Sequence, residues 1–468
     1  MLLKRSSLHF LFLLVFSWAL DVSAQEELGF VNSNYAGVNS LFINPSFMVD
    51  SKIFVDVHLI GMDAFIHNNL MYMPRPDYSP LQRTFPDPLL NDADVNKKAF
   101  AKIDLIGPSI AVSYNTHSFG VFTRLRTFMD AKMTRSLFVL ALKDFDYKSY
   151  SGRSFQEKAY MNTITWFEVG LSYGHMFNYS TDETIDVGIN VKRLTGINST
   201  SITLSNFDFL YNAKKDITIN EADGGYRIVQ PGWGVGQGWG VDIGVNYQKK
   251  LESIAGYKPN TKEAGCKHID YKYKLGLSLL DIGAFNVKNN AILQEFSYKA
   301  EQFKFDNSKI NSFSDFDNTL NSSLTSNSIK QTRGTSYWAW LPFAIGAQFD
   351  YNFENHFYVN ATTITAFKFA NQTKRIDVIS VTPRYERKYF EIDLPISLVD
   401  YRYPQVGLAF RLGNNLIIGS DRIDSFFGKI RDVYGADIYF HLKFAFFRRC
   451  GGKRHYKKSS RTPHCDAY

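Results

Sequence analysis

The chain has 468 residues, a length that suits two or three soluble domains or one large barrel. Aromatic residues make up 16% of it, with 40 Phe and 27 Tyr, more than a soluble enzyme usually carries. The net charge of +8 lies mostly in the residues from Arg448 onward, which contribute +6, so the rest of the chain is close to neutral. This distribution argues against a nucleic-acid-binding protein.

The first residues read as a targeting segment. Lys4 and Arg5 precede an apolar run over 8–20, and Val22-Ser23-Ala24 has the small residues of a cleavage site. We therefore expect a signal peptide over 1–24, and because residue 25 is Gln and not Cys, no lipid anchor. No later apolar run has the roughly 20 residues of a spanning helix. If the mature chain crosses a membrane, it must do so as a closed β-barrel.

Residues 25–51 precede the first predicted strand and form an N-terminal periplasmic or plug segment. The predicted barrel, an all-β antiparallel fold of about 14 strands, then occupies 52–447, and a basic periplasmic tail occupies 448–468. The expected strands are 52–64, 103–114, 118–128, 163–177, 184–194, 238–249, 270–283, 341–353, 356–369, 376–386, 388–396, 405–412, 415–421 and 436–447.

Alternation of apolar and polar residues carries this prediction. In the last strand, Ile438, Phe440, Leu442, Phe444 and Phe446 alternate with polar residues and small ones. A strand with lipid on one side and a polar lumen on the other shows this period of two. A two-sheet sandwich also permits charges on one face, so the number and length of the strands favour the barrel.

The same alternation predicts which side chains face the lumen. They either fill a narrow barrel through salt bridges or line a permeation path. The predicted set is Asp56, His58, Arg124, Arg126, Glu168, Asp186, Lys192 and Asp242.

Connection lengths give the barrel an orientation. Short turns at 115–117, 178–183, 354–355 and 413–414 are expected in the periplasm, and long outside segments at 65–102, 129–162, 195–237 and 284–340. The connection 250–269 is long for an inside turn. Within the outside segments, 130–145 has roughly helical spacing and 306–330 is rich in Asn and Ser. These segments are either lids and receptor-like loops or passive surface loops.

Several motifs suggest a family. They are Asn44-Pro45-Ser46 before the first strand, the Gly/Asp-punctuated strands at 240–245 and 275–283, and the closing 435–439. With these motifs the mature chain resembles an uncharacterised outer-membrane barrel family of Bacteroidota, which is similar to the FadL and PorV types. The resemblance implies about 14 strands and, by analogy, transport of a hydrophobic solute. Asn-Pro-Ser departs from the commoner Asn-Pro-Ala of FadL types.

Two motifs could indicate chemistry. Gly170-Leu171-Ser172-Tyr173-Gly174 matches a nucleophile elbow, but Ser172 falls within an alternating strand instead of a strand-to-helix turn. The Gly-rich run 232–240 lacks phosphate-loop spacing and suggests close packing of a strand or loop. We therefore expect no enzyme and no cofactor.

The tail holds two of the three cysteines. Cys450 and Cys465 could form a disulfide in an oxidising periplasm. A metal site that combines them with His455 and His464 is the alternative, but its spacing fits no usual zinc pattern, so no metal is expected.

Two functions remain open for a protein exported to the outer membrane of a Gram-negative bacterium. The first is a channel or transporter for a small solute, which the FadL resemblance implies is hydrophobic. The second is a structural or secretion-associated protein that acts through its loops and basic tail. The expected partners are outer-membrane lipid, a small solute, and periplasmic or secretion proteins.

Overall fold

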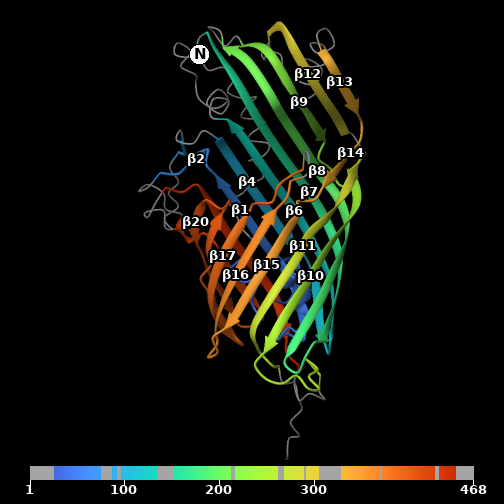
Figure 1. Cartoon of the computed structure of the whole chain (residues 1–468), viewed down its shortest axis with the longest axis vertical. Coiled ribbons are helices and arrows are strands. Elements are labelled where there is room, and N and C mark those ends of the chain that lie inside the picture. Colours follow the sequence, from blue (N-terminus) through green and yellow to red (C-terminus); the bar gives the residue numbers. More distant parts are fainter. Residues whose placement is uncertain are drawn as a thin grey trace, which may run out of the picture.

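A closed antiparallel β-barrel forms most of the computed structural model (Figure 1). The structure describes residues 26–74, 87–91, 96–134, 152–211, 217–261, 268–288, 291–304, 328–368, 372–426 and 432–448. Within these ranges no helix is both long and apolar enough to cross a membrane.

The wall has 14 strands in chain order, four of which are interrupted and therefore carry two labels. The strands are β1 (Val55–Asn68), β4 (Asn96–Ile106) with β5 (Ser109–Tyr114), β6 (His117–Thr134), β7 (Arg153–Asn178), β8 (Glu183–Tyr211), β10 (Gly236–Lys250), β11 (Tyr271–Val287), β14 (Tyr337–Trp340) with β15 (Ala344–Asn352), β16 (Phe357–Ala366), β17 (Val378–Arg387), β18 (Phe390–Asp393) with β19 (Ile396–Val399), β20 (Tyr403–Val406) with β21 (Leu408–Leu412), β22 (Leu416–Ser420) and β23 (Gly435–Phe446).

The last strand closes the barrel against the first. β23 pairs with β1 from Val55 opposite Phe446 to His67 opposite Gly435. Each of the fourteen predicted strands therefore has its counterpart. Three of the interruptions contain a proline, at Pro108, Pro342 and Pro395, where the missing backbone N–H cannot take part in a ladder.

Burial follows the predicted alternation. In β23 the polar side chains of Asp437, His441 and Lys443 are buried inside, whereas Phe444 and Phe446 are exposed outside. Leu275 and Leu277 on β11 show the same outward exposure. An apolar outer surface around a polar interior is the pattern of a barrel that spans a lipid bilayer.

The outside segments contain more strand than predicted. β8 continues to Tyr211, and β9 (Ile217–Val229), β12 (Ala291–Lys304) and β13 (Ser328–Gly334) extend the sheet beyond the barrel (Figure 1). The prediction of loops over 195–237 and 284–340 is therefore wrong for these stretches, because cross-strand pairing with neighbours far along the chain stabilises them. Residues 130–134 likewise belong to β6, not to a helix. The pair β2 (Met71–Tyr72) and β3 (Leu89–Leu90) forms a separate small sheet.

The long connection after β10 lies at the end of the barrel with the short turns. Its residues Ile254, Tyr257 and Ile269 form an apolar cluster with Val49 and Met176. This packing gives the segment a place against the mouth of the barrel, which turn length alone does not predict.

Candidate functional site

Residues 26–53 lie inside the barrel, and we call this segment the plug. The plug contains two short 3-10 helices, η1 (Gly37–Phe42) and η2 (Pro45–Met48), and most of its side chains are buried. This burial favours the plug interpretation of residues 25–51 over the periplasmic one.

Side chains hold most of the plug in place. The Asp421 carboxylate accepts hydrogen bonds from the backbone N–H groups of Leu28 (2.7 Å) and Gly29 (3.2 Å). Lys443 donates to the carbonyl oxygens of Tyr35 and Ala36, each at 2.8 Å. Among the described residues, backbone-to-backbone hydrogen bonds between the plug and the wall begin only at Phe54. The plug is therefore not a strand of the barrel.

The Asn44-Pro45-Ser46 turn docks at the centre of the plug. The Asn44 side chain accepts hydrogen bonds from the backbone N–H (3.1 Å) and hydroxyl (2.6 Å) of Ser46, and donates to the carbonyls of Val245 (3.3 Å) and Leu277 (3.2 Å). Gly188 leaves room for this turn, because a Cβ at that position would overlap the backbone of η2. The turn thus ties the plug to three neighbouring strands.

Five of the predicted lumen residues meet in one ionic network above this turn. Arg126 contacts Asp281 at 2.7 Å and 3.0 Å, and lies 3.6 Å from Glu168. Lys192 contacts Asp242 at 2.6 Å and Asp281 at 2.7 Å. Arg124 pairs with Asp104 and, at 3.4 Å, with Glu168. Arg126 also lies 3.8 Å from Asp104, and Arg375 lies 3.7 Å from Asp281.

Asp281 is central to this network but absent from the sequence-based set. It has a φ of 59° beside an irregularity in the pairing of β10 with β11, so Leu280 and Asp281 are both buried and the period of two is broken. Asp104 was also missed, although it lies in a predicted strand and opposite Arg126 in the ladder.

The plug joins this network through Glu26. Its carboxylate binds the Arg375 guanidinium at 2.5 Å and 2.7 Å and the Lys102 ammonium at 3.3 Å. Burial by itself raises the pKa of Glu26, but the positive charges of Arg375 and Lys102 outweigh burial and lower the pKa from 4.5 to about 2. Glu26 is therefore held as a carboxylate.

The remaining predicted residues lie in two other clusters. Asp56 accepts a hydrogen bond from the backbone N–H of Val38 (2.7 Å), and His58 lies 3.1 Å from His441. Asp186 accepts from Asn246 (2.9 Å) and Gln248 (2.6 Å). All eight predicted side chains are thus buried within the barrel.

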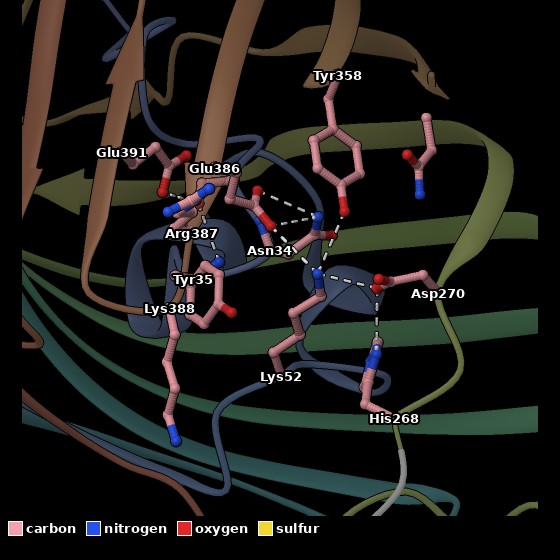
Figure 2. A network of polar contacts seen from close by, with 12 residues as sticks. Asn34, Tyr35, Lys52, His268, Asp270, Tyr358, Glu386, Arg387, Lys388 and Glu391 are labelled. Carbon is pink, nitrogen blue, oxygen red and sulfur yellow. Dashed lines mark hydrogen bonds and ion pairs between the residues drawn. The ribbon is translucent and has the colours of Figure 1, made fainter. Parts of the chain in front are cut away.

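A further network fixes the end of the plug that lies near the short turns (Figure 2). Lys52 lies between Asp270 (2.9 Å) and Glu386 (3.3 Å) and donates to the Tyr358 hydroxyl (3.3 Å). The Asn34 side chain donates to both oxygens of Glu386, at 2.9 Å and 3.1 Å. Burial alone lowers the pKa of Lys52, but these two carboxylates raise it well above its usual value. The alternation did not indicate this network, because half of it belongs to the plug and the turns.

Little space remains between the plug and the wall. The cavity beside Asn34, Tyr271 and Lys274 has about 20 Å³ of room, enough for roughly one water molecule. A cavity beside Glu26, Phe65 and Phe100 has about 10 Å³. Neither of these two cavities, both lined by described residues, has room for an organic solute.

The other motifs give no catalytic arrangement. Ser172 lies in the continuous strand β7 and not at a strand-to-helix turn, and residues 236–240 of the Gly-rich run belong to β10. No group of residues suited to a metal ion is present in the described part of the chain. The predicted signal peptide over 1–24 and the tail residues Cys450, Cys465, His455 and His464 lie outside the described residues.

The model of a family of unknown function, DUF5723, matches residues 45–421. The chain belongs to this family. No curated protein matches the sequence. Among solved structures, the toluene transporter TbuX of Ralstonia pickettii is similar with a TM-score of 0.41 and 9% identity, covering 92% of this chain and 100% of its own.

Two further structures are similar. The toluene transporter TodX of Pseudomonas putida has a TM-score of 0.37 and 9% identity, with 91% of this chain and 97% of its own covered. A FadL homologue of Pseudomonas aeruginosa has a TM-score of 0.24 and 8% identity, with 92% and 99% covered.

Proposed function

We propose that this protein is a plugged outer-membrane channel that passes a small hydrophobic solute when its N-terminal segment moves. The observation that carries the proposal is the attachment of residues 26–53, which contact the wall through side chains and join no ladder among the described strands. A plug held in this way can shift without breaking the hydrogen bonds of the barrel, whose closure keeps the backbone groups satisfied in lipid.

Apolar side chains inside the barrel support the hydrophobic nature of the solute. In the first half of the plug, Leu28 and Phe30 form a cluster with Phe65, Phe100 and other residues of the wall. A second buried cluster includes Phe128, Trp166 and Phe285. Movement of the plug would expose Phe65 and Phe100 of the first cluster to the lumen, where an apolar solute gains free energy by leaving water.

A disulfide that locks the plug tests the proposal. Asn32 in the plug donates a hydrogen bond to Thr362 on β16 (3.1 Å), so the two side chains meet, and a mobility shift on oxidation verifies that cysteines at these positions have joined. The variant Asn32→Cys/Thr362→Cys is made in a background in which the three native cysteines are Ser. The measurement is the uptake of the apolar dye N-phenyl-1-naphthylamine, across an intact outer membrane, by cells that carry this variant.

We expect dye uptake under reducing conditions, its loss on oxidation, and its return with a reductant. The two single-cysteine variants serve as controls and should not respond to oxidation. Equal uptake in the locked and unlocked states would refute the proposed gating. If uptake also equals that of cells without the protein, the non-transporting, structural or secretion-associated function takes its place.

A further inference from the structure

The exposed tryptophans of the described chain all lie on one part of the outer surface. Trp233, Trp239, Trp338 and Trp340 have 70%, 59%, 54% and 54% of their surface exposed, whereas Trp166 is buried inside the barrel. They come from β10, from the residues just before it, and from β14. A general aromatic girdle would distribute such residues around the circumference. This clustering calls for a local explanation.

Strand pairing places these rings next to one exposed cation. One row across the sheet runs from Arg193 to Trp239, then to Ala284 and Trp340. The next row runs from Thr195 through Gln237 and Asn286 to Trp338. We call the side chains of these two rows, together with Trp233, the Trp–Arg patch.

The Trp–Arg patch lies where the outer surface changes from apolar to polar. On β8 the exposed side chains of Val187, Ile189 and Val191 lead up to Arg193. β10 runs in the opposite direction, and its exposed Val245 and Ile243 lie between the end with the short turns and Trp239. Because the short turns mark the opposite end as periplasmic, this border corresponds to the headgroup level of the outer leaflet.

Arg193 carries a charge that no described carboxylate neutralises. The ion pairs among described residues do not include it, and its contacts are the Gly238 carbonyl, the Gln237 side chain and the Trp239 ring, whose centroid is 5.1 Å from the guanidinium. Exposed cations at the periplasmic end differ. Lys249 pairs with Asp182 at 2.8 Å, and Lys272 pairs with Glu354 at 3.0 Å.

We propose that the Trp–Arg patch binds the phosphorylated sugar headgroup of a glycolipid in the outer leaflet. Arg193 would bind a phosphate through its planar set of N–H donors, which suits that group better than an ammonium does. The backbones of Trp239 and Trp340 lie two strands apart, about 10 Å, and each indole offers a flat apolar surface with a polar N–H at the level of the headgroups. The Gln237 side-chain oxygen accepts from Arg193, which leaves its amide N–H groups for sugar hydroxyls. The inference rests on the proposed outer-membrane placement but not on transport.

Binding of lipid A to the purified full-length protein in detergent tests this inference, with native mass spectrometry as the measurement. We expect bisphosphorylated lipid A to bind at least about 10-fold more tightly than dephosphorylated lipid A, and Arg193→Gln to abolish that difference. Lys272→Gln is the matched control, because Lys272 also lies over an aromatic ring, that of Tyr351 at 5.2 Å, but at the other end. It should leave binding unchanged.

A second variant tests the rings. The double substitution Trp338→Leu/Trp340→Leu should weaken the binding of both lipids by a similar factor, since it removes sugar contacts and keeps the charge of Arg193. A mobility shift on boiling verifies that each variant is a folded barrel. Equal binding of the two lipids to the unaltered protein would overturn the inference, as would undiminished binding by Arg193→Gln.

Two other outcomes are distinguishable. If Lys272→Gln and not Arg193→Gln abolishes binding, the orientation of the barrel is reversed, and the proposed placement fails with the site. If the patch is instead covered by a second copy of the chain, the Trp338→Leu/Trp340→Leu variant changes the oligomeric mass and not lipid binding. Either result rejects the glycolipid site.

Discussion

Replacing Glu26 with Gln isolates the ionic anchor at the outer end of the plug. The carboxylate lies between Arg375 and Lys102, and its pKa is lowered from 4.5 to about 2. At 1.36 kcal/mol per unit this shift corresponds to about 3 kcal/mol in favour of the docked plug. The value agrees with the roughly 3–5 kcal/mol lost when one partner of a buried ion pair is removed. The undocked fraction should therefore rise about 100-fold.

Labelling of a buried plug residue measures this fraction. Ala36 is fully buried, so Ala36→Cys in a background without native cysteines reacts with a membrane-impermeant maleimide only when the plug moves. Where opening and closing are fast relative to labelling, the rate reports the population of the open state. We expect labelling about 100-fold faster with Glu26→Gln, and no change with Glu295→Gln, whose carboxylate pairs with Arg227 on the exposed extension.

The dependence on pH has a defined sign. Because docking depresses the pKa of Glu26, its contribution is present above pH 4.5 and is lost as the pH falls toward about 2. Because a maleimide reacts with the thiolate, the labelling rate at each pH is divided by that of a cysteine on an exposed position. This ratio should rise for the unaltered plug across that interval, and Glu26→Gln should show less of the rise. Equal labelling of the two proteins at neutral pH would refute the reasoning.

Three further predictions concern the plug turn and the lumen network. Gly188→Ala places a Cβ against the backbone of η2 and should increase maleimide labelling of the plug, whereas Gly232→Ala, whose nearest neighbour is 3.8 Å away, should not. Asn44→Ala removes the cap of η2 and should destabilise the docked plug by about 1 kcal/mol, measured by the same labelling. Arg126→Leu removes one of the cations that pair with Asp281 and should lower the free energy of unfolding of the barrel by about 3–5 kcal/mol, measured by guanidinium unfolding. An unchanged midpoint would contradict this.

The sequence by itself determined the barrel wall. Alternation along segments such as 436–447 depends only on neighbouring residues, because a strand between lipid and lumen must change character at every step. The same local rule placed Arg124, Arg126, Glu168 and Lys192 on the inner face. Turn residues at the short connections then fixed the orientation of successive strands.

Only the tertiary structure decided what fills the barrel. The contacts of Glu26 with Arg375 and of Leu28 with Asp421 join residues more than 300 positions apart, and no periodicity in the sequence links them. Asp281 escaped detection because a local irregularity shifts the period, and β9 and β12 because their stability comes from pairing with each other. Wall strands are specified by their environment, residue by residue, whereas the plug and its network depend on which distant side chains the closed barrel brings together.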